Sequence, residues 1–188
     1  MKTLFFFLLF CLCDLCHPLM AQRDCWYDAG LGGYSYSGNQ PFTHGIIDGL
    51  LVGASVNWKN QNTFYKIRAN YGAEIQLMST RNPNQNIFDL SGLIGKGYAY
   101  KHLKMNIFTG LGILTGTTRG EFISREQAMF GNSYYQNKSF FSLAIPLNCS
   151  LCLSVSRKFG IGIDCLGGIT PQNAFGGLML KVAIGEIR

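Results

Sequence analysis

Apolar residues alternate with small or polar ones without interruption through the segment Ser139–Val155. The apolar residues occupy the odd positions: Phe141, Leu143, Ile145, Leu147, Cys149, Leu151, Leu153 and Val155. A period of two predicts a β-strand with one apolar face and one small, polar face. The segment exceeds the roughly 9–11 residues that a tilted strand needs to cross a bilayer. We therefore interpret it as a transmembrane strand.

The same alternation predicts seven further strands along the chain. They are Tyr27–Tyr36, His44–Trp58, Phe64–Met78, Ile87–Tyr100, Met105–Thr115, Phe159–Ile169 and Gly177–Ile187. Short turns are expected at Lys59–Asn62, Lys101–Lys104 and Ser156–Lys158, and longer loops at Ser37–Thr43, Ser79–Asn86, Gly116–Lys138 and Thr170–Phe175. An antiparallel meander places all the short turns at one end and all the longer loops at the other. This arrangement predicts an all-β fold, an eight-stranded antiparallel up-and-down transmembrane β-barrel.

The first 21 residues have the features of a secretory signal peptide. Lys2 precedes an apolar run from Leu4 to Leu15, and Leu19, Met20 and Ala21 precede Gln22, with cleavage expected after Ala21. The run is too short for a membrane-spanning helix. We expect residues 1–21 to be removed and residues 22–188 to form the barrel.

Alternation alone leaves open whether the apolar face points to lipid or into the cavity of a soluble, lipocalin-like barrel. Small residues on the polar face suit a narrow eight-stranded interior, which favours apolar side chains facing lipid. Aromatic residues support the same choice, because they gather at strand ends as in membrane interface belts. At the short-turn end these are Tyr27, Trp58, Tyr65, Tyr98, Tyr100 and Phe159, and at the other end Phe88, Phe141 and Phe175.

Three residues conflict with this pattern. Pro146 removes a ladder hydrogen bond in mid-strand, so we expect a bulge or a local break there. Lys96 and Asp48 have the lipid-facing parity, which a charged side chain tolerates only near a rim or after a shift in register.

Composition adds little that is specific. Charged residues make up only 14% of the chain, and the formal net charge is +6. This charge favours anionic surroundings such as lipid phosphates. No basic stripe interleaved with aromatic residues is present, so we expect no nucleic-acid partner.

The pattern resembles the small OmpA/OmpX-type outer-membrane β-barrel family of Gram-negative bacteria. The resemblance rests on the topology and on the final strand, LMLKVAIGEIR (Leu178–Arg188). It implies a monomeric protein in the outer membrane, in contact with outer-membrane lipid after signal-peptide removal. It also implies a non-enzymatic role, structural or in surface interaction through external loops.

Six charged residues share the lumen-facing parity. They are Lys66, Arg68, Glu74, Asp89, Asp164 and Lys181, three of each sign. One hypothesis is a gated path or proton relay. The other is a buried ion-pair network that plugs the barrel, because charges without water must pair.

The segment Gly116–Lys138 is the longest predicted connection, and we expect it to be the outermost external loop. Its apolar residues Met129, Phe130, Tyr134 and Tyr135 are candidates for contact with an extracellular protein or glycan. The alternative is that the strands extend above the membrane and these residues pair within a longer hairpin.

Catalytic and metal-binding patterns are weak. His44 near an external Ser is compatible with a lipid-modifying barrel enzyme, which remains an alternative. The sequence has no spacing typical of metal or cofactor sites, and we expect no cofactor. The hairpin turning at Ser156–Lys158 places Cys149 opposite Cys165. Free thiols are expected there, while disulfide formation among Cys25, Cys149, Cys152 and Cys165 stays open.

Overall fold

The computed structural model of the chain describes residues 25–37, 49–76, 81–126, 131–171 and 173–186. It contains nine strands: β1 (Cys25–Ser37), β2 (Gly49–Asn60), β3 (Thr63–Glu74), β4 (Arg81–Asn82), β5 (Asn86–Tyr100), β6 (Leu103–Arg125), β7 (Ser133–Ser154), β8 (Phe159–Ile169) and β9 (Ala174–Gly185). Among these residues there is no helix with the length and apolar character to cross a membrane. The predicted signal peptide (1–21), His44 and Asp48 lie outside the described residues.

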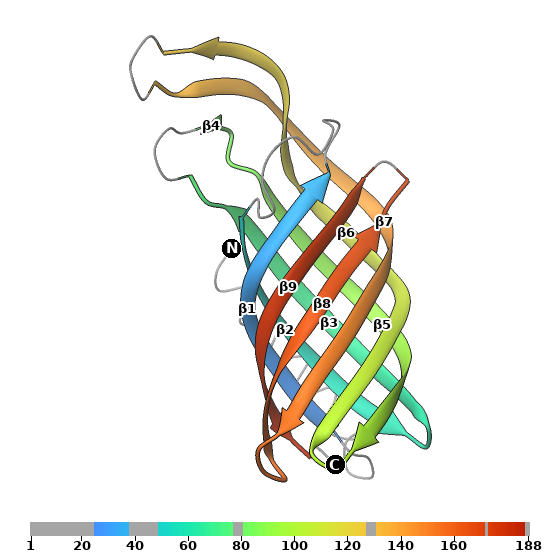
Figure 1. Cartoon of the computed structure of the whole chain (residues 1–188). Helices are drawn as coiled ribbons and strands as arrows, with labels where there is room; N and C mark the ends of the chain where they lie inside the picture. Colours follow the sequence, from blue (N-terminus) through green and yellow to red (C-terminus); the bar gives the residue numbers. More distant parts are fainter. Residues whose placement is uncertain (1–24, 38–48, 77–80, 127–130, 172, 187–188) are drawn as a thin grey trace, which may run out of the picture.

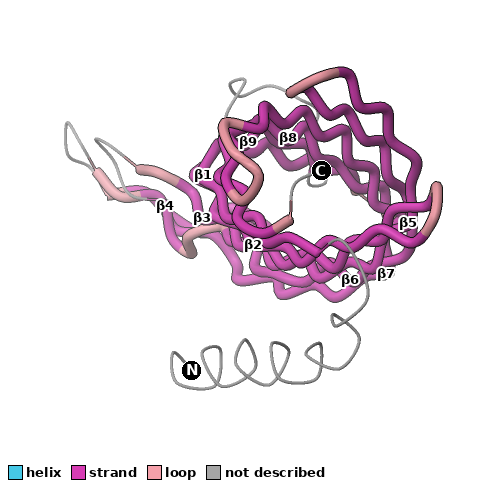
Figure 2. Tube along the Cα trace, turned by 90° about the horizontal axis from the view of Figure 1, so that it is seen from below, coloured by secondary structure: helices cyan, strands magenta, loops and turns pink. Residues whose placement is uncertain are grey.

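Eight of these strands form a closed ring. The hydrogen-bonded order is β7-β6-β5-β3-β2-β1-β9-β8, and pairing between β7 and β8 closes it (Figures 1 and 2). All eight neighbours in the ring are antiparallel, whereas the short β4 pairs in parallel with β7 at Ser133 and Tyr134. The prediction of an eight-stranded up-and-down barrel is confirmed.

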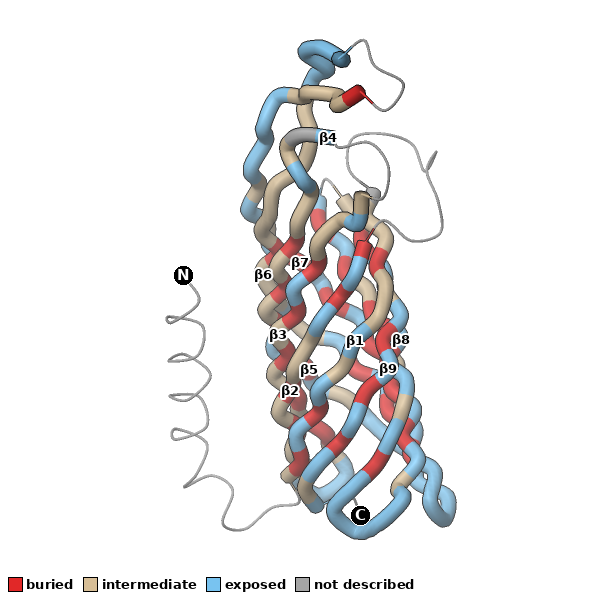
Figure 3. Tube along the Cα trace, turned by 90° about the vertical axis from the view of Figure 1, so that its left-hand side faces the viewer, coloured by how far each residue is buried: buried red, intermediate tan, exposed pale blue. Residues whose placement is uncertain are grey.

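Buried and exposed residues alternate along the strands of the barrel (Figure 3). In β7, Leu143 is 71% exposed while its neighbour Ala144 is 3% exposed. The large apolar side chains exposed on the outward rows are mainly Leu, Ile, Val and aromatic residues. A soluble protein rarely exposes an apolar surface that encircles it. The apolar face is therefore the lipid face, and the soluble lipocalin-like alternative does not fit.

The structure corrects the predicted loop at Gly116–Lys138. β6 continues to Arg125 and β7 begins at Ser133, so the two strands form a hairpin beyond the barrel rim (Figure 1). The register shifts on both sides of Phe122, which marks irregular, bulged pairing. Apolar and polar residues do not alternate in this stretch, because water reaches both faces of the hairpin. The backbone hydrogen bonds that pair the two strands do not require such alternation. The alternative of an extended hairpin is the correct one.

Short turns close the opposite end. Gln61 and Lys101, each the first of two turn residues, have φ of 55° and 52°. A positive φ at this position is typical of two-residue hairpin turns that match the strand twist. β5 and β6 continue to Tyr100 and Leu103, while the pairing of β3 with β5 ends at Phe64 and Gly95. Lys96 thus lies at the rim, as its lipid-facing parity required.

Pro146 produces a local break and no bulge. The pairing of β6 with β7 stops between Thr109–Leu147 and Gly112–Ala144, then resumes in the same register. Pro146 still pairs with Gly168 of β8. Since proline lacks an N–H, the ladder is lost only on the β6 side.

Aromatic residues encircle the short-turn end. Tyr98 and Tyr100 are 72% and 58% exposed, and Trp58 stacks on Tyr65 with ring centroids 5.6 Å apart. The assignment of Phe175 to the outer belt is wrong. β9 begins earlier than predicted, and its alternation turns Phe175 into the lumen, where the residue is buried.

Candidate functional site

Four charged side chains meet at mid-height in the lumen. Lys66 Nζ lies 2.7 Å from Asp164 Oδ2, and Lys181 Nζ lies 2.9 Å from Asp164 Oδ1. Asp28 joins them, with its Oδ2 at 3.0 Å from Lys181 Nζ and 3.8 Å from Lys66 Nζ. Each residue is at most 4% exposed. β8, β9 and β1 are neighbours in the sheet, whereas β3 lies across the lumen and reaches them only because the barrel closes.

A second buried pair lies on β3 and β5. Arg68 places Nη2 at 2.8 Å and Nε at 3.0 Å from Asp89 Oδ2. Asn70 Nδ2 donates to the same oxygen at 2.9 Å, and the Ser91 hydroxyl donates to Asp89 Oδ1. The carboxylate is therefore surrounded by donors, which offsets its removal from water.

Neutral polar side chains add hydrogen bonds to the network. Asn148 Oδ1 accepts from Lys66 Nζ at 2.8 Å, and Ser150 Oγ accepts from Lys181 Nζ at 2.6 Å. Ser55 Oγ and Asn57 Nδ2 donate to Asp28 at 3.3 and 3.0 Å. These are the small polar residues that alternate with lipid-facing ones along the strands.

Apolar clusters close the lumen above and below these charges. Toward the long-loop end lie Tyr34, Leu51, Ile87, Leu114, Ala144, Leu166, Phe175 and Met179, and toward the short-turn end Trp26, Phe64, Leu93, Phe108, Cys152 and Ala183. The upper cluster fits closely, because a Cβ added at Gly49 or Gly72 would lie 2.7 Å from Tyr34 Cε1. Charges enclosed between two apolar layers act as a plug.

The structure buries five of the six predicted lumen residues, three in the central cluster and two in the Arg68–Asp89 pair, and leaves out Glu74. Glu74 lies near the outer end of β3 and binds Arg119 of β6. Its place is taken by Asp28, which sequence reasoning missed. Asp28 is the only carboxylate in the first strand, but aromatic residues occur on both faces of that strand, so its parity gave no signal.

Arg119 braces the external hairpin against the loop that follows β3. Besides its ion pair with Glu74, it donates from Nε to the Pro83 carbonyl at 3.1 Å and from Nη2 to the Arg81 carbonyl at 3.3 Å. Its guanidinium also lies over the ring of Tyr135, with Cζ 5.7 Å from the centroid. Together with β4, these contacts fix the base of the hairpin.

The part of the hairpin beyond this brace exposes apolar side chains. Phe122 and Ile123 are 59% and 65% exposed, and Phe122 makes an edge contact with Tyr135. Tyr135 is one of the four predicted contact residues. It is half-buried, so it packs against the exposed Phe122 and supports the apolar surface from beneath. Met129 and Phe130 lie outside the described residues. Sequence reasoning did not single out Phe122 and Ile123, although they are adjacent apolar residues in the same stretch.

Tyr134 closes the hairpin near its tip. Its hydroxyl donates to Glu126 Oε1 at 2.8 Å, and the Asn132 N–H donates to Glu126 Oε2 at 3.1 Å. These hydrogen bonds lower the pKa of the Glu126 carboxyl, and the bond to the carboxylate raises the pKa of Tyr134. Glu126 and Tyr134 therefore join the two strands at the outer end of the described hairpin.

The described residues give little support for a disulfide or a metal site. Cys149 pairs directly with Cys165 across β7 and β8, as predicted, and Cys149, Cys152 and Cys165 have free thiols. Among the described residues, no group of three or more His, Cys, Asp or Glu side chains is arranged to hold a metal ion.

Comparison with known proteins gives relatives by structure alone. No family model and no curated protein matches the sequence. The chain is similar to the crystal structure of Neisserial surface protein A, NspA, with a TM-score of 0.62 and 8% identity over 85% of this chain and 96% of that one.

A second similar structure is Ail, the attachment invasion locus protein of Yersinia pestis. Its TM-score is 0.59 with 9% identity, covering 87% of this chain and 98% of that one. Ail in complex with the heparin analogue sucrose octasulfate has a TM-score of 0.56, with the same identity and coverage. The strands form a closed ring with lipid-facing apolar rows and a filled lumen, and the similar structures share this architecture. The chain therefore has the fold of the small, eight-stranded, OmpA/OmpX-type outer-membrane β-barrels.

Proposed function

We propose that this membrane barrel is a non-enzymatic surface-interaction protein that binds an extracellular protein or glycan through the hairpin of β6 and β7. The observation that carries the proposal is the exposure of Phe122 and Ile123 on a hairpin that is braced at its base. Both side chains lie beyond the barrel rim, where no lipid would cover them.

The brace favours binding over simple solvation. Ordering a mobile loop on binding costs conformational entropy, which Arg119, Glu74 and β4 reduce by fixing the hairpin in advance. Aromatic and arginine side chains are enriched at interfaces, and apolar anchors rimmed by polar groups supply most of the binding energy.

A glycan partner has additional support from charge. Arg81, Arg125 and Lys138 are exposed on the external segments, where Glu121 and Glu126 are exposed as well. Basic and aromatic side chains together suit a sulfated or carboxylated sugar, since the cations pair with its anions and the rings stack on its apolar faces. The heparin analogue bound to the similar barrel Ail gives a suitable first probe.

The filled lumen supports a role at the surface instead of transport. The described lumen residues pack as two apolar layers around paired charges, so the scaffold is rigid and the hairpin is its most protruding part (Figure 1). Binding residues commonly lie on loops that such scaffolds position.

The test is binding of intact cells that display the barrel to immobilised heparin and to a panel of extracellular matrix proteins. Phe122→Ser with Ile123→Ser should reduce binding at least tenfold, whereas Gln136→Ser with Asn137→Ser, at exposed polar positions on the same hairpin, should leave it unchanged. Equal binding by both double variants and the parent would contradict the proposal. Loss of a lipid modification in cells lacking the protein would instead support the alternative of a lipid-modifying enzyme.

A further inference from the structure

One edge of β7 lacks a neighbouring strand where the hairpin rises above the barrel (Figure 1). β6 occupies the other edge, so β4 and β8 share this one. β8 pairs with it from the short turn up to Ile145, which lies opposite Ile169. β4 pairs with it only at Ser133 and Tyr134, near the outer end of the hairpin. Among the described strands none pairs with the part between them, so the free edge of β7 spans residues 135–144.

Proline limits both strands that adjoin the free edge. Pro83 follows directly after β4, and Pro171 falls at the register position opposite Leu143, just past the end of β8. Because a proline has no N–H to donate to a ladder, neither strand continues along β7. Thr170 instead begins a turn, in which its N–H donates to the Asn173 carbonyl at 2.8 Å.

The main-chain groups of alternate residues point toward the free edge. The Ser154 N–H donates to the His102 carbonyl on the β6 side, and the Val155 N–H donates to the Phe159 carbonyl on the β8 side. Since this direction alternates along an antiparallel strand, odd-numbered residues present their N–H and C=O groups to the free edge. They are Asn137, Ser139, Phe141 and Leu143. Such an unpaired row is a template for another strand.

The free edge is open to solvent. Gln136, Asn137, Lys138 and Ser139 are all exposed, although successive side chains of a strand point to opposite faces. Both faces of β7 are therefore uncovered in this stretch. The Leu143 carbonyl has the Ser142 hydroxyl as a donor at 3.3 Å, which is a local contact and leaves room for a strand partner.

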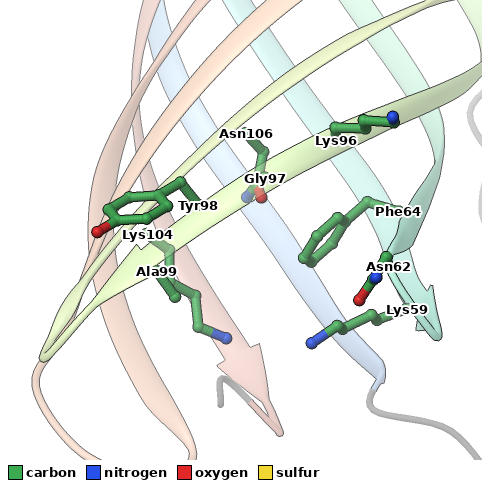
Figure 4. A pocket seen from close by; sticks show the side chains of 9 residues that line it. All are labelled: Lys59, Asn62, Phe64, Lys96, Gly97, Tyr98, Ala99, Lys104 and Asn106. Carbon is green, nitrogen blue, oxygen red and sulfur yellow. The ribbon is translucent and has the colours of Figure 1, made fainter.

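The opposite end of the barrel has an edge of a different character. Past Gly95, β5 has no partner among the described residues of β3. Lys59 and Lys96 are among the residues that line the hollow of about 360 Å³ beside this edge (Figure 4). Charged side chains, lysine above all, discourage the addition of a strand. The free edge of β7 has one charged residue, Lys138, so it is the better template of the two.

We propose that the free edge of β7 binds an extended segment of a partner protein as an added β-strand. The inference rests on the proposed function, and it narrows the extracellular partner to a protein with an unpaired, extended segment. Main-chain hydrogen bonds to the odd-numbered residues of the free edge supply the affinity. β4 is an example within the chain, because it is a short extended segment already paired with the same edge.

The side chains of β7 indicate the sequence of the partner segment. Residues directly opposite one another in paired strands lie on the same face of the sheet. Phe141 and Leu143 are 69% and 71% exposed, so they favour two apolar residues separated by one position. The exposed Lys138 favours a carboxylate three positions from the residue opposite Phe141. A segment that combines these apolar and acidic residues fits the free edge.

The experiment measures the binding of a fluorescent peptide to the mature protein in lipid nanodiscs by anisotropy. The peptide is rich in Thr, with two Val separated by one residue and a Glu three positions after the second Val, the order that antiparallel pairing requires. The parent protein should bind this peptide, and a fully N-methylated counterpart, which has no main-chain donors, should not bind.

A proline variant and a matched alanine variant separate main-chain pairing from side-chain contact. Asn137→Pro with Ser139→Pro removes two donors from the free edge and none from the ladder with β6, and it should weaken peptide binding about tenfold. Asn137→Ala with Ser139→Ala removes the same side chains but keeps both N–H groups, so it should bind like the parent. Unheated gel migration checks folding. If the double proline variant does not fold, Asn137→Pro alone should weaken binding about threefold.

Three results in nanodiscs would overturn the proposal. They are equal binding by the proline and alanine variants, binding of the N-methylated peptide, and a proline-sensitive dimer of the protein, which would assign the free edge to a second copy of the chain. Cells give a further test. If Phe122→Ser with Ile123→Ser loses binding to matrix proteins while the proline variant binds them like the parent, the proposed function stands and strand addition fails. If neither variant alters cell binding, both fail.

Discussion

The ammonium group of Lys66 contacts the carboxylate of Asp164 at 2.7 Å, although the two residues are 98 positions apart in the sequence. The contact joins β3 to β8 across the lumen, between strands that are not neighbours in the sheet. It can form only in the closed barrel, so it reports on closure directly.

Replacing Asp164 by Asn should destabilise the barrel by about 3–5 kcal/mol, because it leaves Lys66 and Lys181 with an uncompensated buried charge. Glu121→Ala, which removes an exposed charge, should cost less than about 1 kcal/mol. Glu74→Ala should fall between them, since Glu74 is paired but lies near the rim. Urea unfolding in lipid vesicles measures all three, and equal midpoints would contradict a paired lumen.

Gly72→Val should destabilise the barrel by about 1–3 kcal/mol through overpacking against the ring of Tyr34. Combining it with Tyr34→Ala should cost less than the sum of the two single changes, because the valine then fills the space that the ring leaves. Gly92→Val is the matched control, since the nearest atom to a Cβ there lies 4.0 Å away. Strict additivity in the urea midpoints would show that Tyr34 does not occupy this place.

Purified protein in planar bilayers should show no stable, large-conductance openings. Two apolar layers enclose the paired charges, and eight strands leave room only for side chains. Sustained channel currents from samples free of porins would be incompatible with a plugged lumen.

Cys149, Cys152 and Cys165 should react with maleimide after unfolding without a reductant. Cys149 and Cys165 face each other in the sheet but are free thiols in the structure. Mass spectrometry counts the labels, and a reductant-treated sample serves as the reference. Labels missing only from the peptides with Cys149 and Cys165 would reveal a cross-strand disulfide.

Trypsin added to intact cells should cut the external hairpin at Arg125 before Arg119. Arg125 is exposed near the tip, whereas Arg119 has a side chain only 9% exposed and an ion pair with Glu74. Peptide mapping identifies the site, and Arg125→Gln should slow cleavage. Cutting that requires permeabilised cells would place the hairpin on the inner side of the membrane and remove the basis for a surface role.

Sequence alone determined the barrel, because a repeated period of two is a local property that each strand carries by itself. The row from Phe141 to Val155 already showed which side chains face lipid. The short polar turns and the opposition of Cys149 and Cys165 followed from the same alternation, since a tight hairpin leaves only one register.

Tertiary structure decided the partners of the lumen charges and the shape of the external end. Parity shows that Glu74 points inward, but it does not show how far along the barrel axis Glu74 lies from Lys66 or Lys181. That distance depends on how the strands are staggered. Asp28 lies at the height of these lysines and Glu74 does not. Likewise, the brace at Arg119 depends on a loop that returns to β7. These are relations between distant segments, which a periodic pattern along one chain does not encode.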